Sequence, residues 1–231
     1  MKRVVESELL DHLPPADAAA RQSRRDLLRI NRLMGNAGVL ARALQSTLGN
    51  RAPLDILELG AGDGLLLLQV GRQLAPRWTG VRVRLLDRTS LVESSTIHEF
   101  SKIGWTAEPI SGEALEWLSQ RRAPVAAVVA NLFIHHFAEP DLKMLLAEIA
   151  SRADVFVAVE PRRAHLPLLA SSLLWAIGCN TVTRHDARKS VRAGFVGREL
   201  SNLWPASPDW ELTERSAGVF SHLFIARRRT V

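Results

Sequence analysis

Short apolar runs alternate with helical patterns from residue 55 to residue 159, and this alternation constrains the fold more than any other feature of the sequence. Strands that alternate with helices form parallel sheets with right-handed crossovers. The apolar run at 125–130 is continuous, which is typical of a central strand covered on both faces. The sequence predicts an α/β, doubly wound, mainly parallel sheet, with strands at 55–59, 81–86, 106–110, 125–130 and 155–159 and helices at 65–74, 90–100, 113–120 and 141–150.

Different patterns flank this alternating region. Residues 162–208 contain two helical patterns, at 165–177 and 190–204, and Asp186 is a candidate N-cap of the second. A strand at 211–215, a turn at 216–218 and a strand at 220–226 follow. We therefore expect seven strands, with an antiparallel last strand. Two helices are predicted before the sheet, at 17–32 and 37–48. The expected organisation is an N-terminal helical cap at 1–50 and one domain at 51–231, with a helical insertion at about 162–208.

Composition excludes several classes of protein. The chain has 231 residues, of which 47% are hydrophobic and 23% charged, and this suits one folded α/β core and not a disordered chain. Its one cysteine, Cys179, rules out a disulfide scaffold and a multi-cysteine zinc site. No apolar run approaches the roughly 20 residues of a membrane span, and the N-terminus lacks a signal-peptide pattern. We expect a soluble, cytoplasmic protein.

The net charge of +6 comes almost entirely from arginine, with 26 Arg against 4 Lys. A basic chain can bind nucleic acid. Here the arginines are scattered singly or in pairs, and the run at 227–229 lies at the extreme end. A general compositional bias toward arginine is the simpler interpretation. Nucleic acid is therefore an unlikely partner, although RNA binding stays open as an alternative.

A glycine cluster at 60–64 lies between the first predicted strand and its helix, which is the context of a nucleotide-binding loop. Glycine lets a backbone turn sharply and approach a ligand closely. The dinucleotide fingerprint requires a third glycine at position 65, where this chain has Leu65, and this conflicts with a nicotinamide oxidoreductase. A phosphate loop of the NTPase kind is excluded because no Gly-Lys-Ser/Thr sequence follows.

Polar residues also follow the next three predicted strands. Asp87 ends the second strand, where a carboxylate can accept two hydrogen bonds from a ribose diol. Glu113 follows the third strand and could accept from an adenine amine. The segment 131–137, Asn-Leu-Phe-Ile-His-His-Phe, follows the fourth strand. All of these lie at the carboxyl edge of the predicted sheet, where open α/β folds bind ligands.

The segment 58–64, Glu-Leu-Gly-Ala-Gly-Asp-Gly, resembles the first motif of the class I, Rossmann-like S-adenosylmethionine-dependent methyltransferases, and Asp87, Glu113, the 131–136 segment and the closing hairpin extend this resemblance. It implies S-adenosylmethionine as cofactor. The binding residues that it implies are Glu58, Gly60, Ala61, Gly62, Asp87, Arg88, Glu113, Ala114, Asn131 and Leu132. The segment 29–36 is similar to the N-terminal cap of small stand-alone bacterial methyltransferases, some of them associated with phenolic polyketides or quinones.

Three histidines are candidate general bases: His135 and His136 after the fourth strand, and His185 in the insertion. No metal is expected, because no third ligand is spaced with His135 and His136. The apolar helix at 165–177 favours an aromatic or acyl-bearing small molecule as the acceptor. The resemblance implies that this acceptor is phenolic or quinone-like, and oxygen is the favoured acceptor atom, with carbon next. An RNA methyltransferase and a non-catalytic S-adenosylmethionine-binding module are the alternatives. Methylation of a nucleic-acid base amine is disfavoured, because Asn131 is followed by Leu-Phe and not by Pro-Pro-aromatic. The oligomeric state is left open.

Overall fold

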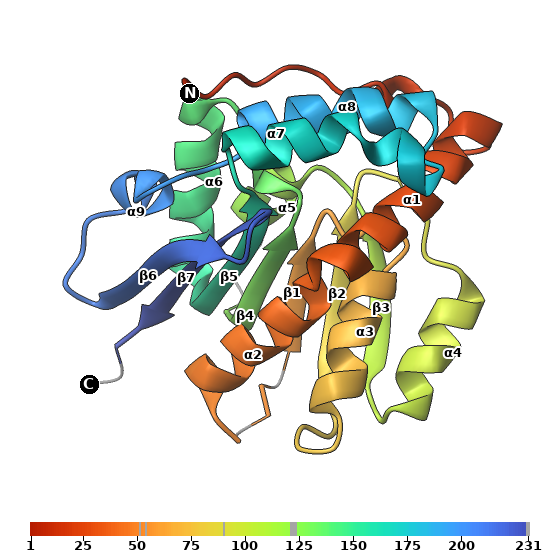
Figure 1. The fold of residues 1–231 in the computed structure, drawn as a ribbon. Coiled ribbons are helices and arrows are strands. Elements are labelled where there is room, and N and C mark those ends of the chain that lie inside the picture. The colour runs from red at the N-terminus through yellow and green to blue at the C-terminus, as the bar shows by residue number, and fades with distance from the viewer. Residues whose placement is uncertain (51, 54, 90, 121–123, 230–231) are drawn as a thin grey trace.

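A computed structural model describes residues 1–229 except 51, 54, 90 and 121–123 (Figure 1). Its centre is a seven-stranded sheet of order β3-β2-β1-β4-β5-β7-β6. The strands are β1 (Asp55–Leu59), β2 (Arg82–Asp87), β3 (Thr106–Ser111), β4 (Val125–Asn131), β5 (Ala153–Pro161), β6 (Trp210–Ala217) and β7 (Ser221–Arg228). The first five strands are mutually parallel, and β7 runs antiparallel to both β5 and β6. This confirms the predicted doubly wound, mainly parallel sheet with an antiparallel last strand.

Helices cover both faces of the sheet, as the continuous apolar strands require. On one face lie α2 (Asn36–Leu48) and α3 (Leu65–Leu74), with α4 (Ser94–Lys102) beside them. On the other lie α5 (Ala114–Gln120) and α6 (Glu139–Arg152). Every residue of β1 is buried between these layers. Among the described residues, no helix combines the length and apolar character that a membrane crossing requires.

The N-terminal region divides into two parts with different roles. A 3-10 turn, η1 (Leu10–His12), and α1 (Ala18–Met34) lie over the carboxyl edge of the sheet (Figure 1). Asp17 caps α1 as predicted, since its carboxylate accepts hydrogen bonds from the backbone N–H groups of Ala19 and Ala20. After the left-handed Gly35, α2 turns down onto the sheet and buries Leu40 and Leu44 in the same core cluster as α3.

The helical insertion consists of α7 (His165–Ser172), the 3-10 helix η3 (Leu174–Ile177), α8 (Thr181–Ala193) and the short α9 (Glu199–Leu203). The predicted helix at 190–204 is wrong in its bounds. Asn180, not Asp186, caps α8, and α8 ends at Ala193. The next residue is Gly194, where a Cβ would lie 2.1 Å from the carbonyl oxygen of Pro161. The polar first half of α8 has too few apolar positions to give a helical hydrophobic pattern.

Candidate cofactor and acceptor site

The loop between β1 and α3 depends on three left-handed glycines, Gly60, Gly62 and Gly64, with φ of 68°, 56° and 73°. Two of them are also in tight contact. A Cβ on Gly60 would lie 2.2 Å from the Phe133 ring, and one on Gly64 would lie 2.8 Å from Leu85. At Gly62, nothing lies within 4 Å of the position that a Cβ would take. The loop therefore presents bare backbone to open space at Gly62, which suits the close approach of a ligand.

Asp87, the last residue of β2, is fixed against this loop. Its Oδ2 accepts a hydrogen bond from the N–H of Gly62 at 2.9 Å, and its Oδ1 accepts one from the N–H of Thr89 at 3.0 Å. An ionised carboxylate has about four acceptor positions, so each oxygen can still accept from a further donor. The geometry is compatible with a ribose diol held between the ends of β1 and β2.

Arg88 and Glu113 lie farther along the same edge. Nε of Arg88 is 3.8 Å from Oε1 of Glu113, and its guanidinium also contacts Asp11 of the N-terminal segment at 3.2 Å. The Glu113 side chain is 62% exposed, so it is free to accept from a bound base. Ala114 is buried at the start of α5. Ala61 is buried and donates from its backbone N–H to the carbonyl of Leu86.

Glu58 is the buried acid beneath the glycine loop. Within the described part of the chain, its Oε2 has no hydrogen-bond partner. Burial, together with the negative charges of Asp63 and Asp87, raises the pKa of this carboxyl well above its usual value. A cation bound at the loop would give the Glu58 carboxyl a partner and would stabilise its ionised form. The acidic residues at the loop thus suit a ligand that brings positive charge, as the sulfonium and ammonium groups of S-adenosylmethionine do.

Asn131 and Leu132 end β4 beside the loop. The Asn131 amide exchanges hydrogen bonds with the N-terminal helices: its Oδ1 accepts from Asn36 at 2.9 Å, and its Nδ2 donates to Asn31 at 3.0 Å. Its side chain therefore holds α1 and α2 to the sheet. Leu132 has φ 50°, and no other non-glycine residue in the described ranges has a positive φ. Such a conformation in a residue other than glycine is strained, and strain of this kind concentrates at functional sites.

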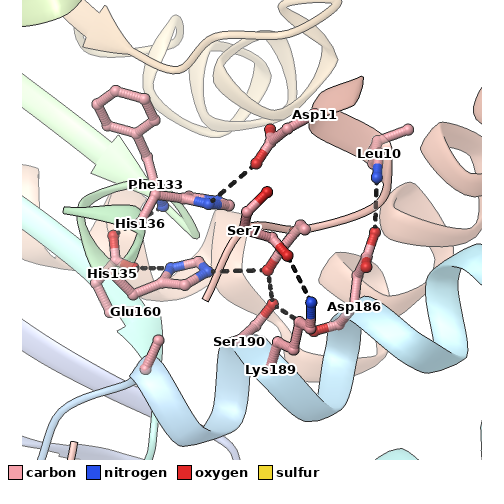
Figure 2. A network of polar contacts seen from close by, with 12 residues as sticks. Ser7, Leu10, Asp11, Phe133, His135, His136, Glu160, Asp186, Lys189 and Ser190 are labelled. Carbon is pink, nitrogen blue, oxygen red and sulfur yellow. Dashed lines mark hydrogen bonds and ion pairs between the residues drawn. The ribbon is translucent and has the colours of Figure 1, made fainter. Parts of the chain in front are cut away.

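His135 is buried, and a carboxylate lies beside each of its two ring nitrogens. Figure 2 shows the network around this residue. Its Nδ1 is 2.7 Å from Oε2 of Glu160, whose Oε1 accepts from the N–H groups of Phe133 and Ile134. Its Nε2 faces Oε1 of Glu8 at 3.6 Å. Burial alone would lower the pKa of His135, but the hydrogen bond to Glu160 and the negative charges of Glu160 and Glu8 outweigh it and raise the pKa to about 9. His135 is therefore an imidazolium at neutral pH.

His136 is in a different electrostatic state. Its ring lies against that of His135, with 4.3 Å between the ring centroids, and its Nδ1 is 3.7 Å from Oδ2 of Asp11. Burial and the positive charge on His135 lower the pKa of His136. It is therefore neutral at pH 7 and can accept a proton.

His185 lies elsewhere. It is on the outer side of α8, about half exposed, with Nδ1 2.9 Å from Oδ1 of Asp186. Asp186 itself accepts from the backbone N–H groups of Leu9 and Leu10, and Figure 2 shows the bond from Leu10. The structure thus brings His135 and His136 together at the sheet edge and leaves His185 on the surface groove between α7 and α8.

Sequence reasoning missed Glu8, Glu160 and Ser190. The hydroxyl of Ser190 donates to Glu8, which links α8 to His135. Glu8 also lies close enough to both histidines that donor atoms of all three are within 4.8 Å of one another. These are donor types that metal sites use. The proton on His135 offsets one of the two neighbouring carboxylate charges, and we assign no metal ligands here.

An apolar cavity of about 190 Å³ opens beside Leu132, between the sheet edge and α1, α7, η3 and α8. Its walls are mostly aliphatic, and Ser171 and Ser190 are their hydroxyl-bearing residues. Leu132 directly precedes Phe133, whose ring lies on Gly60. The wall of the cavity at Leu132 thus adjoins the residue that packs on the glycine loop. Its mostly apolar lining is typical of a small-molecule site, and its volume is smaller than the roughly 300–1,000 Å³ of most such sites.

Comparisons with known proteins agree with this architecture. No family model and no curated protein matches the sequence. Solved structures do match. The plantazolicin methyltransferase BpumL in complex with S-adenosylhomocysteine (SAH) has a TM-score of 0.65 at 14% identity, over 93% of this chain and 92% of that one.

Two further structures have the same fold. The mitomycin 7-O-methyltransferase MmcR has a TM-score of 0.62 at 15% identity, over 96% of this chain and 61% of that one. The magnesium protoporphyrin IX methyltransferase ChlM from Synechocystis PCC 6803, with bound SAH, has a TM-score of 0.54 at 12% identity, over 95% and 91%. The chain thus has the Rossmann-like fold of the class I S-adenosylmethionine-dependent methyltransferases.

Proposed function

We propose that this protein is an S-adenosylmethionine-dependent methyltransferase. The observation that carries the proposal is the arrangement of Gly62, Asp87 and Glu58: an open backbone cradle, a carboxylate fixed against it, and a buried acid without a partner. Glu58 would favour the cationic end of the cofactor, Asp87 would accept from its ribose, and Glu113 would accept from its adenine. Bound there, the cofactor supplies a methyl group activated by a sulfonium.

The proposed acceptor is a small aromatic molecule, phenolic or quinone-like, that occupies the apolar cavity beside Leu132 and is methylated at oxygen. The aliphatic walls favour a flat apolar ring, and the cavity volume limits its size. The similarity in fold to a mitomycin 7-O-methyltransferase supports oxygen as the acceptor atom. A cavity without water favours this chemistry, because a phenolate and a sulfonium neutralise each other as they react. Holding the two reactants aligned can lower the activation free energy of the reaction by roughly 7–11 kcal/mol.

The acceptor must lose a proton, and His136 is the histidine that we propose to take it. His135 is already protonated between Glu160 and Glu8, and His185 lines the outer groove. His136 is neutral because the charge on His135 lowers its pKa. In this proposal His135 is a positioning residue, which orders the loop after β4 through Glu160. General-base catalysis of this kind contributes about 10²–10⁴-fold.

The test has two steps. Calorimetry with S-adenosylmethionine measures binding, and methyl-labelled cofactor then measures transfer to a panel of phenols and reduced quinones. Binding with transfer to a phenol oxygen is the expected result. Absence of cofactor binding up to millimolar concentration would refute the proposal. Binding without turnover on the panel would favour a non-catalytic module, and salt-sensitive methylation of RNA would favour the RNA alternative.

A further inference from the structure

Helix α7 exposes two of its three leucines and buries a serine. Leu166 and Leu169 are 58% and 61% exposed, whereas Ser171 is 5% exposed and faces inward. A surface helix normally buries its leucines. Leu173 and Trp175 continue the exposed apolar surface into η3. We call the exposed apolar residues of this region, together with the two at the mouth of the acceptor cavity, the lid face: Leu33, Leu166, Leu169, Leu173, Trp175 and Ile177.

The lid face is continuous with the acceptor cavity. Leu33 and Ile177 belong to both, since they line the cavity and are also exposed at the surface. The other lid-face residues lie on α7 and η3, which contribute Ala170 and Leu174 to the cavity wall. Exposed apolar side chains that gather on one surface and are bordered by polar residues are typical of an interaction site. Whatever covers the lid face therefore also covers the entrance to the cavity.

Positive charge borders the lid face. Helices α7 and α8 pack side by side (Figure 1) and enclose a groove of about 520 Å³ that Ser171 and Ser172 of α7 share with α8. The cationic side chains that line it from α8 are Arg184, Arg188, Lys189 and Arg192. Against them, Glu6 is the acidic residue in the lining, and it pairs with Lys189 at 3.8 Å. The groove thus carries a net positive charge beside an apolar surface.

We propose that the lid face docks on a lipid bilayer with anionic headgroups. A bilayer offers apolar and anionic character on one surface, and proteins bind it through exposed leucine and tryptophan flanked by basic residues. A second copy of the chain fits less well, because a two-fold contact on this face would bring two basic grooves close together. Docking is independent of the proposed methyl transfer. If that function also holds, the acceptor enters from the membrane and is a lipid-soluble phenol.

Trp175 provides a direct readout. It is 60% exposed, whereas the other five tryptophans of the chain are buried: Trp78, Trp105, Trp117, Trp204 and Trp210. Vesicles of phosphatidylcholine and phosphatidylglycerol with brominated acyl chains should quench the fluorescence of Trp175 on docking. The Trp175→Phe variant should lose this quenching and keep the remaining fluorescence.

Sedimentation with the same vesicles tests the two components of the surface. We expect the full chain to bind at low salt, and to bind phosphatidylcholine vesicles more weakly. The Arg188→Glu/Arg192→Glu variant should bind more than about tenfold more weakly, because each cation contributes several-fold near an anionic surface. The Leu166→Ser/Leu169→Ser/Leu173→Ser variant should lose quenching. Met144→Ser, at an apolar position on α6 that is 50% exposed, is the control and should bind normally.

Two results would overturn the proposal: no vesicle binding by the full chain at low salt, or equal binding by the triple serine variant. Light scattering without vesicles gives a third: a dimer that the triple serine variant dissociates would assign the lid face to a second copy. Calorimetry with S-adenosylmethionine on the same samples separates the two proposals. If the protein binds vesicles but not the cofactor, the proposed methyltransferase function is contradicted. If it binds the cofactor but not vesicles, the proposed membrane docking is contradicted.

Discussion

The carboxylate of Glu8 lies 3.6 Å from Nε2 of His135, although Glu8 belongs to the N-terminal segment and His135 follows β4. On the opposite side of the ring, Glu160 holds Nδ1 at 2.7 Å. One buried imidazolium thus joins the N-terminal segment to the end of β5. These two contacts hold the N-terminal segment against the carboxyl edge of the sheet. They also make the stability of the fold depend on the protonation of His135.

Protonation of His135 predicts a loss of stability at alkaline pH. Its pKa in the folded chain, about 9, lies above the ordinary value of 6.5. A raised pKa stabilises the fold fully below about pH 6.5, and the stabilisation is lost as the pH rises through about 9. The free energy of unfolding should therefore fall by up to about 3 kcal/mol across this range.

Urea unfolding of the wild type and the Glu8→Gln variant at several pH values checks this. The variant should be less stable by about 1–3 kcal/mol at pH 6.5, and its stability should depend less on pH. Glu6→Gln, which removes a more exposed partner of Lys189, is the control. Parallel pH curves for the wild type and Glu8→Gln would show that Glu8 has no part in holding the proton.

The raised pKa of Glu58 predicts proton release when the cofactor binds. Burial and the charges of Asp63 and Asp87 favour the protonated acid in the free protein. A bound sulfonium or ammonium would favour the carboxylate, so its pKa falls and the proton leaves. The enthalpy of S-adenosylmethionine binding should therefore differ between buffers of different ionisation enthalpy. The Glu58→Gln variant should abolish that difference, and an unchanged buffer dependence would place the proton elsewhere.

Two glycines of the loop separate the effects of folding and of binding. A Cβ at Gly62 meets no atom within 4 Å, so Gly62→Ala should fold with a cost of about 1–2 kcal/mol for its left-handed backbone. It should nevertheless lose cofactor binding, because the methyl group enters the cradle. Gly60→Ala meets the Phe133 ring at 2.2 Å and should lose considerably more stability. Thermal unfolding and calorimetry distinguish the two, and normal binding by Gly62→Ala would contradict the assigned cradle.

Replacement of the proposed base should affect turnover and leave binding intact. His136→Gln should lower kcat about 10²–10⁴-fold with unchanged affinity for S-adenosylmethionine. The acidic limb of the pH–rate profile should disappear with it. His165→Gln, at an exposed histidine that begins α7, is the control. If the limb persists in His136→Gln, another group accepts the proton.

The fold could be predicted because its signals are local. The apolar runs of β1 and β4, the glycine loop and Asp87 all lie within a few residues of the elements that they define. Periodicity and turn chemistry are properties of such short segments. The start of α8 could not be found in this way, because it depends on Asn180 as its cap and on long-range contacts such as that between Thr183 and Asp26.

The parts of the site that were missed depend on contacts between distant segments. The contacts of Glu8 with His135, of Asn31 with Asn131 and of Ser190 with Glu8 all join segments that are far apart in the sequence. They depend on the packing of α1 and α8 across the edge of the sheet. No spacing in the sequence encodes those pairs. Glu160 did carry a signal, since a lone acid at the end of an apolar strand must find buried partners. Phe133, Ile134 and His135 are those partners.

Calorimetric titration of the wild type and the Asp87→Ala variant with S-adenosylmethionine tests the central claim most directly. The wild type should bind in the micromolar to millimolar range. Asp87→Ala should bind about 10–150-fold more weakly, because hydrogen bonds to a carboxylate contribute about 1.5–3 kcal/mol. Glu116→Gln, an exposed acid on α5, should bind as the wild type does. Equal affinity in wild type and Asp87→Ala, or no binding by either, would contradict the account.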